Sequence, residues 1–141
     1  MAEKHGEELQ RFAEGLIRLV RDRAVRASDR LASGAMVGPD GERWRSLVAS
    51  KETSQAIREL IPDIVDQTLF ELLNATDNGE LPLGWRVSEG SFVGLEDLGL
   101  GEMAGSLMGS PGWRHDYSAQ RFFDPLSDLR LGLDPEPSDE K

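Results

Sequence analysis

Apolar residues recur every three or four positions between residues 9 and 31, which is the spacing of one face of an α-helix. The stripe consists of Leu9, Phe12, Leu16, Leu19, Val20, Ala24, Ala27 and Leu31. Acidic residues gather near its start and arginines near its end, so the charges complement the helix dipole. The pattern predicts a helix over residues 3–31, which Gly34 ends.

A second apolar surface covers residues 57–73, after a segment that resembles a loop. Residues 34–43 combine three glycines with a proline and an Asp-Gly pair, which predicts a turn or exposed loop, and a short helix is expected to start at Trp44. Pro62 lacks a backbone N–H and clashes with the preceding turn. We therefore expect one helix to end near Leu60 and a stronger one to run from Pro62 to Asp77.

The chain changes character after Gly79. Residues 84–87 and 91–95 are predicted to form two short strands joined by a turn at 88–90. A lone hairpin is only marginally stable, so it must pack on the helices. Short helices are expected within 101–109 and 114–123. The predicted fold is α+β, with N-terminal helices packed on a small antiparallel sheet and with short C-terminal helices.

Length and composition are those of one small domain. The chain has 141 residues, 38% of them hydrophobic, and we expect a single domain over residues 1–131 and a disordered acidic tail over 132–141. The absence of cysteine excludes disulfides and thiolate chemistry, which makes the cytoplasm the expected location. The N-terminus does not resemble a signal peptide, and no apolar run approaches the roughly 20 residues that span a bilayer.

Charge is distributed unevenly along the chain. The net charge is −10. Residues 1–51 contain ten Lys/Arg and eight Asp/Glu, whereas residues 52–141 contain six Lys/Arg and eighteen Asp/Glu. Such an imbalance favours a basic partner that is attracted by a negative field, with plain solubility as the alternative explanation.

Motifs for enzymatic chemistry are weak. Residues 99–104 are spaced like a dinucleotide phosphate loop, but no βαβ unit surrounds them. Ser106 does not occupy the serine position of a G-x-S-x-G elbow. His115 neighbours Asp116 and Tyr117, yet adjacency in sequence does not make a catalytic triad. We therefore expect no catalytic residue and no bound cofactor.

Two further classes of site are also disfavoured. Glu59, Asp63 and Asp66 would share one face of an unbroken helix, and carboxylates alone suit Mg²⁺ or Ca²⁺. No second acidic motif completes such a site, so no metal is expected. The first helix is rich in arginine, but interleaved acids and the negative total argue against direct nucleic-acid binding.

Several segments resemble small uncharacterised bacterial proteins. They are residues 60–70 (LIPDIVDQTLF), 101–105 (GEMAG), 112–114 (GWR) and 117–118 (YS), within a stretch of about residues 54–123. In its size, its acidity and its lack of a catalytic motif, the chain is similar to the acidic immunity proteins of polymorphic toxin systems. That resemblance implies a protein that neutralises a toxin, and it assigns no role to individual residues.

Together these observations favour a non-enzymatic binding protein, in concrete terms a bacterial immunity or antitoxin protein that blocks a basic toxin by electrostatic occlusion. The predicted partner-binding residues are six carboxylates and two aromatic anchors: Glu59, Asp63, Asp66, Glu96, Asp97, Glu102, Trp85 and Trp113. The alternative is a small enzyme or ligand-binding domain with a pocket near Trp113, His115 and Asp116. A third reading is a homodimer formed through an exposed apolar helix surface.

Overall fold

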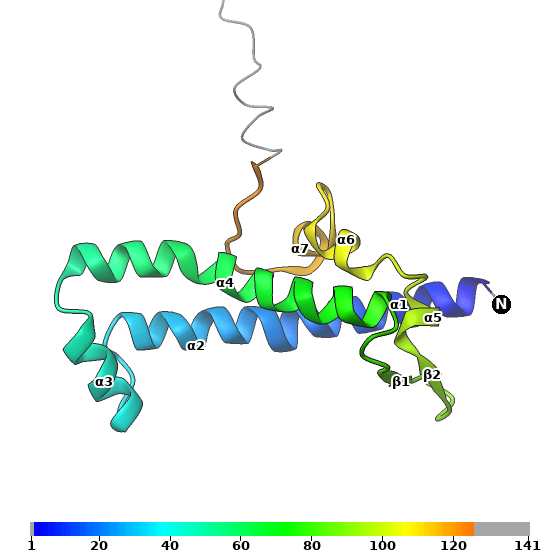
Figure 1. Ribbon diagram of the computed structural model, residues 1–141, viewed down its shortest axis with the longest axis horizontal. Coiled ribbons are helices and arrows are strands. Elements are labelled where there is room, and N and C mark those ends of the chain that lie inside the picture. The colour runs from blue at the N-terminus through cyan, green and yellow to red at the C-terminus, as the bar shows by residue number, and fades with distance from the viewer. Residues whose placement is uncertain (1, 126–141) are drawn as a thin grey trace, which may run out of the picture.

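Two long helices lie side by side and antiparallel, and every other element packs against this pair (Figure 1). The computed structural model describes residues 2–125. The predicted boundary of the domain at residue 131 and the predicted acidic tail at 132–141 lie outside the described residues. The predicted α+β class is confirmed, since helices dominate and the sheet has two antiparallel strands.

The elements follow one another in the order α1 (Ala2–Gly15), η1 (Leu16–Arg21), α2 (Asp22–Ala32), α3 (Pro39–Leu47), α4 (Lys51–Asp77), β1 (Gly84–Arg86), β2 (Phe92–Gly94), α5 (Leu95–Leu98), α6 (Met103–Met108) and α7 (Trp113–Tyr117). The first three form one continuous helix, as predicted. Part of the segment expected to be a loop is helical, because α3 starts at Pro39, and proline suits the first position of a helix.

The first long helix contains a turn of π-helix, η1, which shifts its buried face by one residue. Leu16 and Ile17 are buried, but Leu19 and Val20, which the periodicity places in the core, are 56% and 49% exposed. Arg21 and Val25 are buried instead. A π-helical turn holds more residues than an α-helical turn, so each later residue is rotated away from the place that a regular helix would give it. The predicted apolar stripe is therefore wrong at Leu19, Val20 and Ala27, which are exposed, whereas Ala24 and Leu31 are half-buried.

The predicted break at Pro62 is also wrong, because α4 continues from Lys51 to Asp77 without interruption. A proline at position 62 removes the hydrogen bond that its N–H would donate to the carbonyl of Arg58. The guanidinium of Arg121 donates to that carbonyl instead, and the same group makes two hydrogen bonds of 2.8 and 2.7 Å to the carboxylate of Asp29. A residue 63 positions from Arg58 thus supplies the missing donor.

The hairpin is confirmed, with Trp85 opposite Val93 in the register. It is fastened to α1 by the carboxylate of Glu8. This carboxylate accepts hydrogen bonds from the backbone N–H and the hydroxyl of Ser88 at 2.8 and 2.6 Å and from the indole of Trp85 at 3.1 Å, and it pairs with Arg11. These donors, led by the Ser88 hydroxyl, lower the pKa of Glu8 from 4.5 to about 2.

The stabilising effect of Glu8 is expected to depend on pH. Its pKa is lower in the folded protein than in the unfolded chain, so its contribution is complete above pH 4.5 and is lost as the pH falls toward 2. The melting temperature of Glu8→Gln should therefore lie below that of the unchanged protein at neutral pH, and the gap should narrow through this acid range. Thermal unfolding at a series of pH values measures it, with Glu7→Gln as the control. If the difference in melting temperature between the two proteins stays constant down to pH 2, the lowered pKa of Glu8 is contradicted.

The main core lies between the helix pair and the short C-terminal helices. Ile17 and Leu73 meet Leu95, Met103 and Leu107 there, and all five are at most 4% exposed. Asp77 fixes α6 in place, since its two carboxylate oxygens accept hydrogen bonds from the N–H groups of Met103 and Ala104. Among the described residues, no helix is both long enough and apolar enough to cross a membrane.

Candidate functional site

Asp66, one of the predicted partner-binding residues, lies inside the molecule. It is 2% exposed, and its carboxylate is shared by two buried guanidinium groups. Arg21 donates two hydrogen bonds to it, at 2.6 and 3.2 Å, and Arg114 donates one at 3.1 Å. A carboxylate held in this way cannot reach a partner at the surface, so this part of the prediction is corrected. Asp66 joins α4 to the end of η1 and to α7.

The same network holds the segment that follows α7. Asp22, 4% exposed, accepts hydrogen bonds from the hydroxyl of Ser118 and the N–H of Ala119, both at 2.8 Å. Arg21 donates to the carbonyl of Arg121 at 3.0 Å. Two arginines and two aspartates therefore balance one another inside the protein. Burial of charge is tolerated only under such pairing, so we interpret this network as structural.

Trp113, predicted as an aromatic anchor, belongs to the core. It is 8% exposed, and its ring meets Phe12 edge to face at a centroid distance of 6.1 Å. His115 beside it is already engaged, because its Nδ1 accepts from the N–H of Gly112 and its Nε2 lies 2.9 Å from a carboxylate oxygen of Asp124. Trp113 thus acts in packing and not as a surface anchor.

The remaining predicted carboxylates are exposed, but they fall into two groups. Glu59 and Asp63 share the outer face of the first half of α4. Glu96, Asp97 and Glu102 lie beyond the far end of that helix, in α5 and before α6. Asp63 is separated from the end of α4 at Asp77 by 14 residues, or about 21 Å of helix. The structure therefore offers two separate acidic surfaces.

Negative charge is more concentrated around the second group. We call its three residues, Glu96, Asp97 and Glu102, the acidic cluster. Residues 71–105 contain seven Asp/Glu and one Lys/Arg, which is Arg86. The carboxylate of Glu96 lies against the turn that ends α4, where a Cβ at Gly79 would be 3.1 Å from its Oε2. None of the three cluster residues forms an ion pair with another described residue. Their negative charge is therefore free to act on a partner.

An exposed leucine stands within this cluster in a strained backbone conformation. The helices α2, α4 and α5 all end in the same hydrogen-bonded turn, whose bonds run from Ala35 to Arg30, from Glu80 to Ala75 and from Gly101 to Glu96. The turn requires one residue with a positive φ. Glycine fills that position after α2 and α4, but Leu100, with φ 56°, fills it after α5.

This conformation costs an L-residue about 1–2 kcal/mol relative to the right-handed one. Burial does not compensate, because Leu100 is 78% exposed. Among the described residues it is the single non-glycine residue with a positive φ. Strain retained at an exposed position is typical of functional sites. Leu100 was not among the predicted site residues, although an apolar residue between two glycines and near three acids is a signal that could have identified it.

Trp85, the other predicted anchor, is half-buried in the hairpin. Its ring packs edge to face on Phe12 at 5.3 Å, and the guanidinium of Arg11 lies over it at 4.7 Å. Its indole N–H donates a hydrogen bond to the carboxylate of Glu8. Trp85 therefore joins the hairpin to α1, and only its exposed edge is open to a partner.

Comparison with known proteins adds no relative: no family model, no curated protein and no solved structure matches the chain. The described residues contain no group of three or more His, Cys, Asp or Glu side chains arranged to hold a metal ion. The acidic cluster with Leu100 is thus identified from its geometry alone.

Proposed function

We propose that this protein is a non-enzymatic binding protein, whose acidic cluster and Leu100 together form the binding surface for a basic protein partner. The observation that carries the proposal is the strained, exposed leucine close in sequence to three carboxylates that lack ion-pair partners among the described residues. Carboxylates guide and orient a cationic partner, and an apolar side chain at the centre supplies the desolvated contact that adds affinity.

The most specific form of the proposal is an immunity protein. A toxin that acts on nucleic acid needs Lys and Arg side chains to hold phosphates. Carboxylates that pair with those cations would occlude them, and the toxin would lose its substrate. The absence of cysteine is consistent with action in the cytoplasm.

Charge reversal at the acidic cluster is expected to abolish partner binding. Proteins from the native cell lysate are captured on the unchanged protein and on Glu96→Lys/Asp97→Lys, and the captured partner is then titrated to obtain its Kd. We expect the Kd to rise at least about a hundredfold, because opposite charges become like charges. Binding should also weaken at high salt.

The matched control is Glu59→Lys/Asp63→Lys, which changes the net charge by the same amount on the other acidic surface. It should keep most of the affinity. An equal loss in both variants would show that only net charge matters and would refute the acidic cluster as the site. A partner that binds the cluster variant unchanged would refute it as well.

Leu100→Gly separates binding from folding. Glycine relieves the left-handed strain, and the greater flexibility of glycine in the unfolded chain offsets part of that gain, so stability should rise by about 0–1 kcal/mol. Partner binding should weaken by about tenfold, because the apolar contact is removed. Thermal unfolding and the same titration measure the two effects. A variant that is less stable yet binds normally would show that Leu100 serves the fold.

A further inference from the structure

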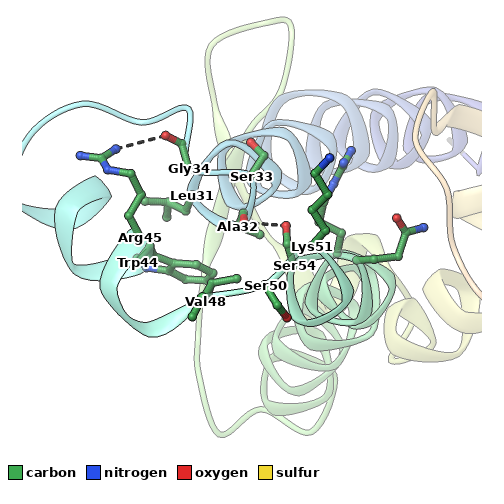
Figure 2. Close-up of a pocket in the computed structure, with 13 residues that line it drawn as sticks. Leu31, Ala32, Ser33, Gly34, Trp44, Arg45, Val48, Ser50, Lys51 and Ser54 are labelled. Atoms are coloured by element: carbon green, nitrogen blue, oxygen red, sulfur yellow. Dashed lines mark hydrogen bonds between the residues drawn. The ribbon is translucent and has the colours of Figure 1, made fainter.

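A cavity of about 480 Å³ lies where the end of α2, α3 and the start of α4 meet (Figure 2). This end of the helix pair is opposite to the one that carries α5 and the acidic cluster (Figure 1). Three segments line this cavity, which is open to solvent: the end of α2 with the following turn, the second half of α3, and the first two turns of α4. In Figure 2, Trp44 and Val48 lie on one side of the cavity, and Lys51 and Ser54 lie on the other. Its volume falls within the usual range of small-molecule sites.

The side chains that line this cavity carry positive charge and no negative charge. Arg45, Lys51 and Arg58 contribute to the lining, and no Asp or Glu does, although the whole chain has a net charge of −10. Lys51 and Arg58 are seven residues apart on α4, so they lie on the same face of that helix. The cavity is thus a cationic region on the surface of an acidic protein.

These cations are poorly neutralised within the protein. Lys51 forms no ion pair with another described residue. Arg58 is 49% exposed, and its Nε lies 3.8 Å from a carboxylate that Arg121 already holds through two shorter hydrogen bonds. Arg45 donates to two backbone carbonyls, those of Gly34 and Met36, and not to a carboxylate. An anion in the cavity would meet the ammonium group of Lys51 and the guanidinium group of Arg58, whose charge Asp29 neutralises only in part.

The opposite wall is apolar and held in place by packing. Trp44 is half-buried and packs against the second, smaller core cluster, which consists of Val25, Ala32 and Ile61. The turn in front of α3 is fixed by the hydrogen bonds of Arg45 and by the close approach of Gly41, whose Cβ would lie 1.9 Å from the carbonyl oxygen of Met36 if it were another residue. The α3 side of the cavity is therefore held in place by contacts within the protein, which lowers the entropic cost of binding there.

We infer that this cavity binds a small organic anion of the nucleoside monophosphate class. Lys51 and Arg58 would hold the phosphate, since ammonium and guanidinium groups bind phosphate through charge-assisted hydrogen bonds. The planar base would lie against the Trp44 wall, where aromatic contact contributes affinity without selecting strongly among bases. This site is independent of the acidic cluster, and neither proposal depends on the other.

The test uses AMP as the probe with the full chain, and follows backbone amide signals by NMR during titration. We expect saturable shifts confined to residues 31–34 and 44–58. Lys51→Gln/Arg58→Gln should raise the Kd at least tenfold, and Trp44→Phe should raise it to a smaller extent. The matched control Arg23→Gln/Arg26→Gln removes two arginines outside the lining and should leave the Kd unchanged.

Two comparisons separate the contributions of phosphate and base. Inorganic phosphate and adenosine should each bind more weakly than AMP, because each contacts one wall alone. Equal affinity for phosphate and AMP would refute the contact with Trp44. Shifts outside the cavity, an unchanged Kd in the Lys51/Arg58 variant, or no saturable shift with AMP would refute the site. Each variant is checked by thermal unfolding, so that loss of the fold is not mistaken for loss of binding.

Discussion

Replacing Asp66 with alanine is expected to lower the free energy of unfolding by about 3–5 kcal/mol, because it leaves two buried guanidinium groups without the carboxylate they share. Arg21 and Arg114 are 0% and 3% exposed, so neither can turn to water when the carboxylate is removed. The loss should exceed that of an ordinary surface ion pair, which contributes about 0–1 kcal/mol. Urea unfolding followed by circular dichroism measures it.

Asp63→Ala is the matched control for this prediction. Asp63 stands three residues earlier on the same helix and is exposed, so its replacement should change the free energy of unfolding by no more than about 0.5 kcal/mol. A difference of less than 1 kcal/mol between the two variants would mean that the buried network contributes little. Hydrogen exchange should also quicken over residues 118–123, because this segment is attached through Arg21 and its neighbours.

Replacing Trp113 with alanine is expected to lower the free energy of unfolding by about 3–5 kcal/mol, the usual cost of removing a large aromatic side chain from a core. The ring is 8% exposed and packs with Phe12 in the main core cluster. Trp113→Phe keeps part of the contact area and should cost distinctly less. Urea unfolding of both variants provides the comparison.

The outcome decides between two roles for this tryptophan. If Trp113 were a surface anchor, its replacement would leave the free energy of unfolding nearly unchanged and would weaken only partner binding. A loss below about 1 kcal/mol would therefore contradict the packing seen here. A large loss would agree with the place of this tryptophan in the main core cluster.

The C-terminal segment after α7 has more structural importance than its irregular backbone suggests. Arg121 completes the hydrogen bonding that Pro62 interrupts, and its contact with Asp29 raises its pKa above the ordinary arginine value. The ring of Phe122 covers the guanidinium of Arg114 at 4.8 Å. A proline in the middle of a long helix and two arginines in a core are tolerated because this segment packs against them.

Much of the fold follows from local pattern. The first long helix and the hairpin were predictable because helical and strand periodicities depend on neighbours a few residues away. The acidic character of residues 52–141 was equally visible in the composition. Of the predicted site residues, Glu96, Asp97 and Glu102 are brought together at the surface, while Glu59 and Asp63 lie on a second surface.

The parts that could not be predicted depend on pairs of residues far apart in the chain. From the sequence Asp66 is expected to be one more surface acid, because its partner Arg21 is 45 residues away in the chain. Pro62 is expected to break the helix, because the sequence does not show that Arg121 donates a hydrogen bond to the carbonyl of Arg58. Leu100 becomes notable only when its backbone angle is known.

By itself the sequence determined the first long helix, the hairpin and the part of the chain that carries the negative charge, because these depend on short-range periodicity and on composition. The tertiary structure alone decided which carboxylates are buried, how the π-helical turn shifts the first helix, and where the cationic cavity lies. Those features arise from desolvation and hydrogen-bond partners, and both are set by which distant segments meet in the folded chain.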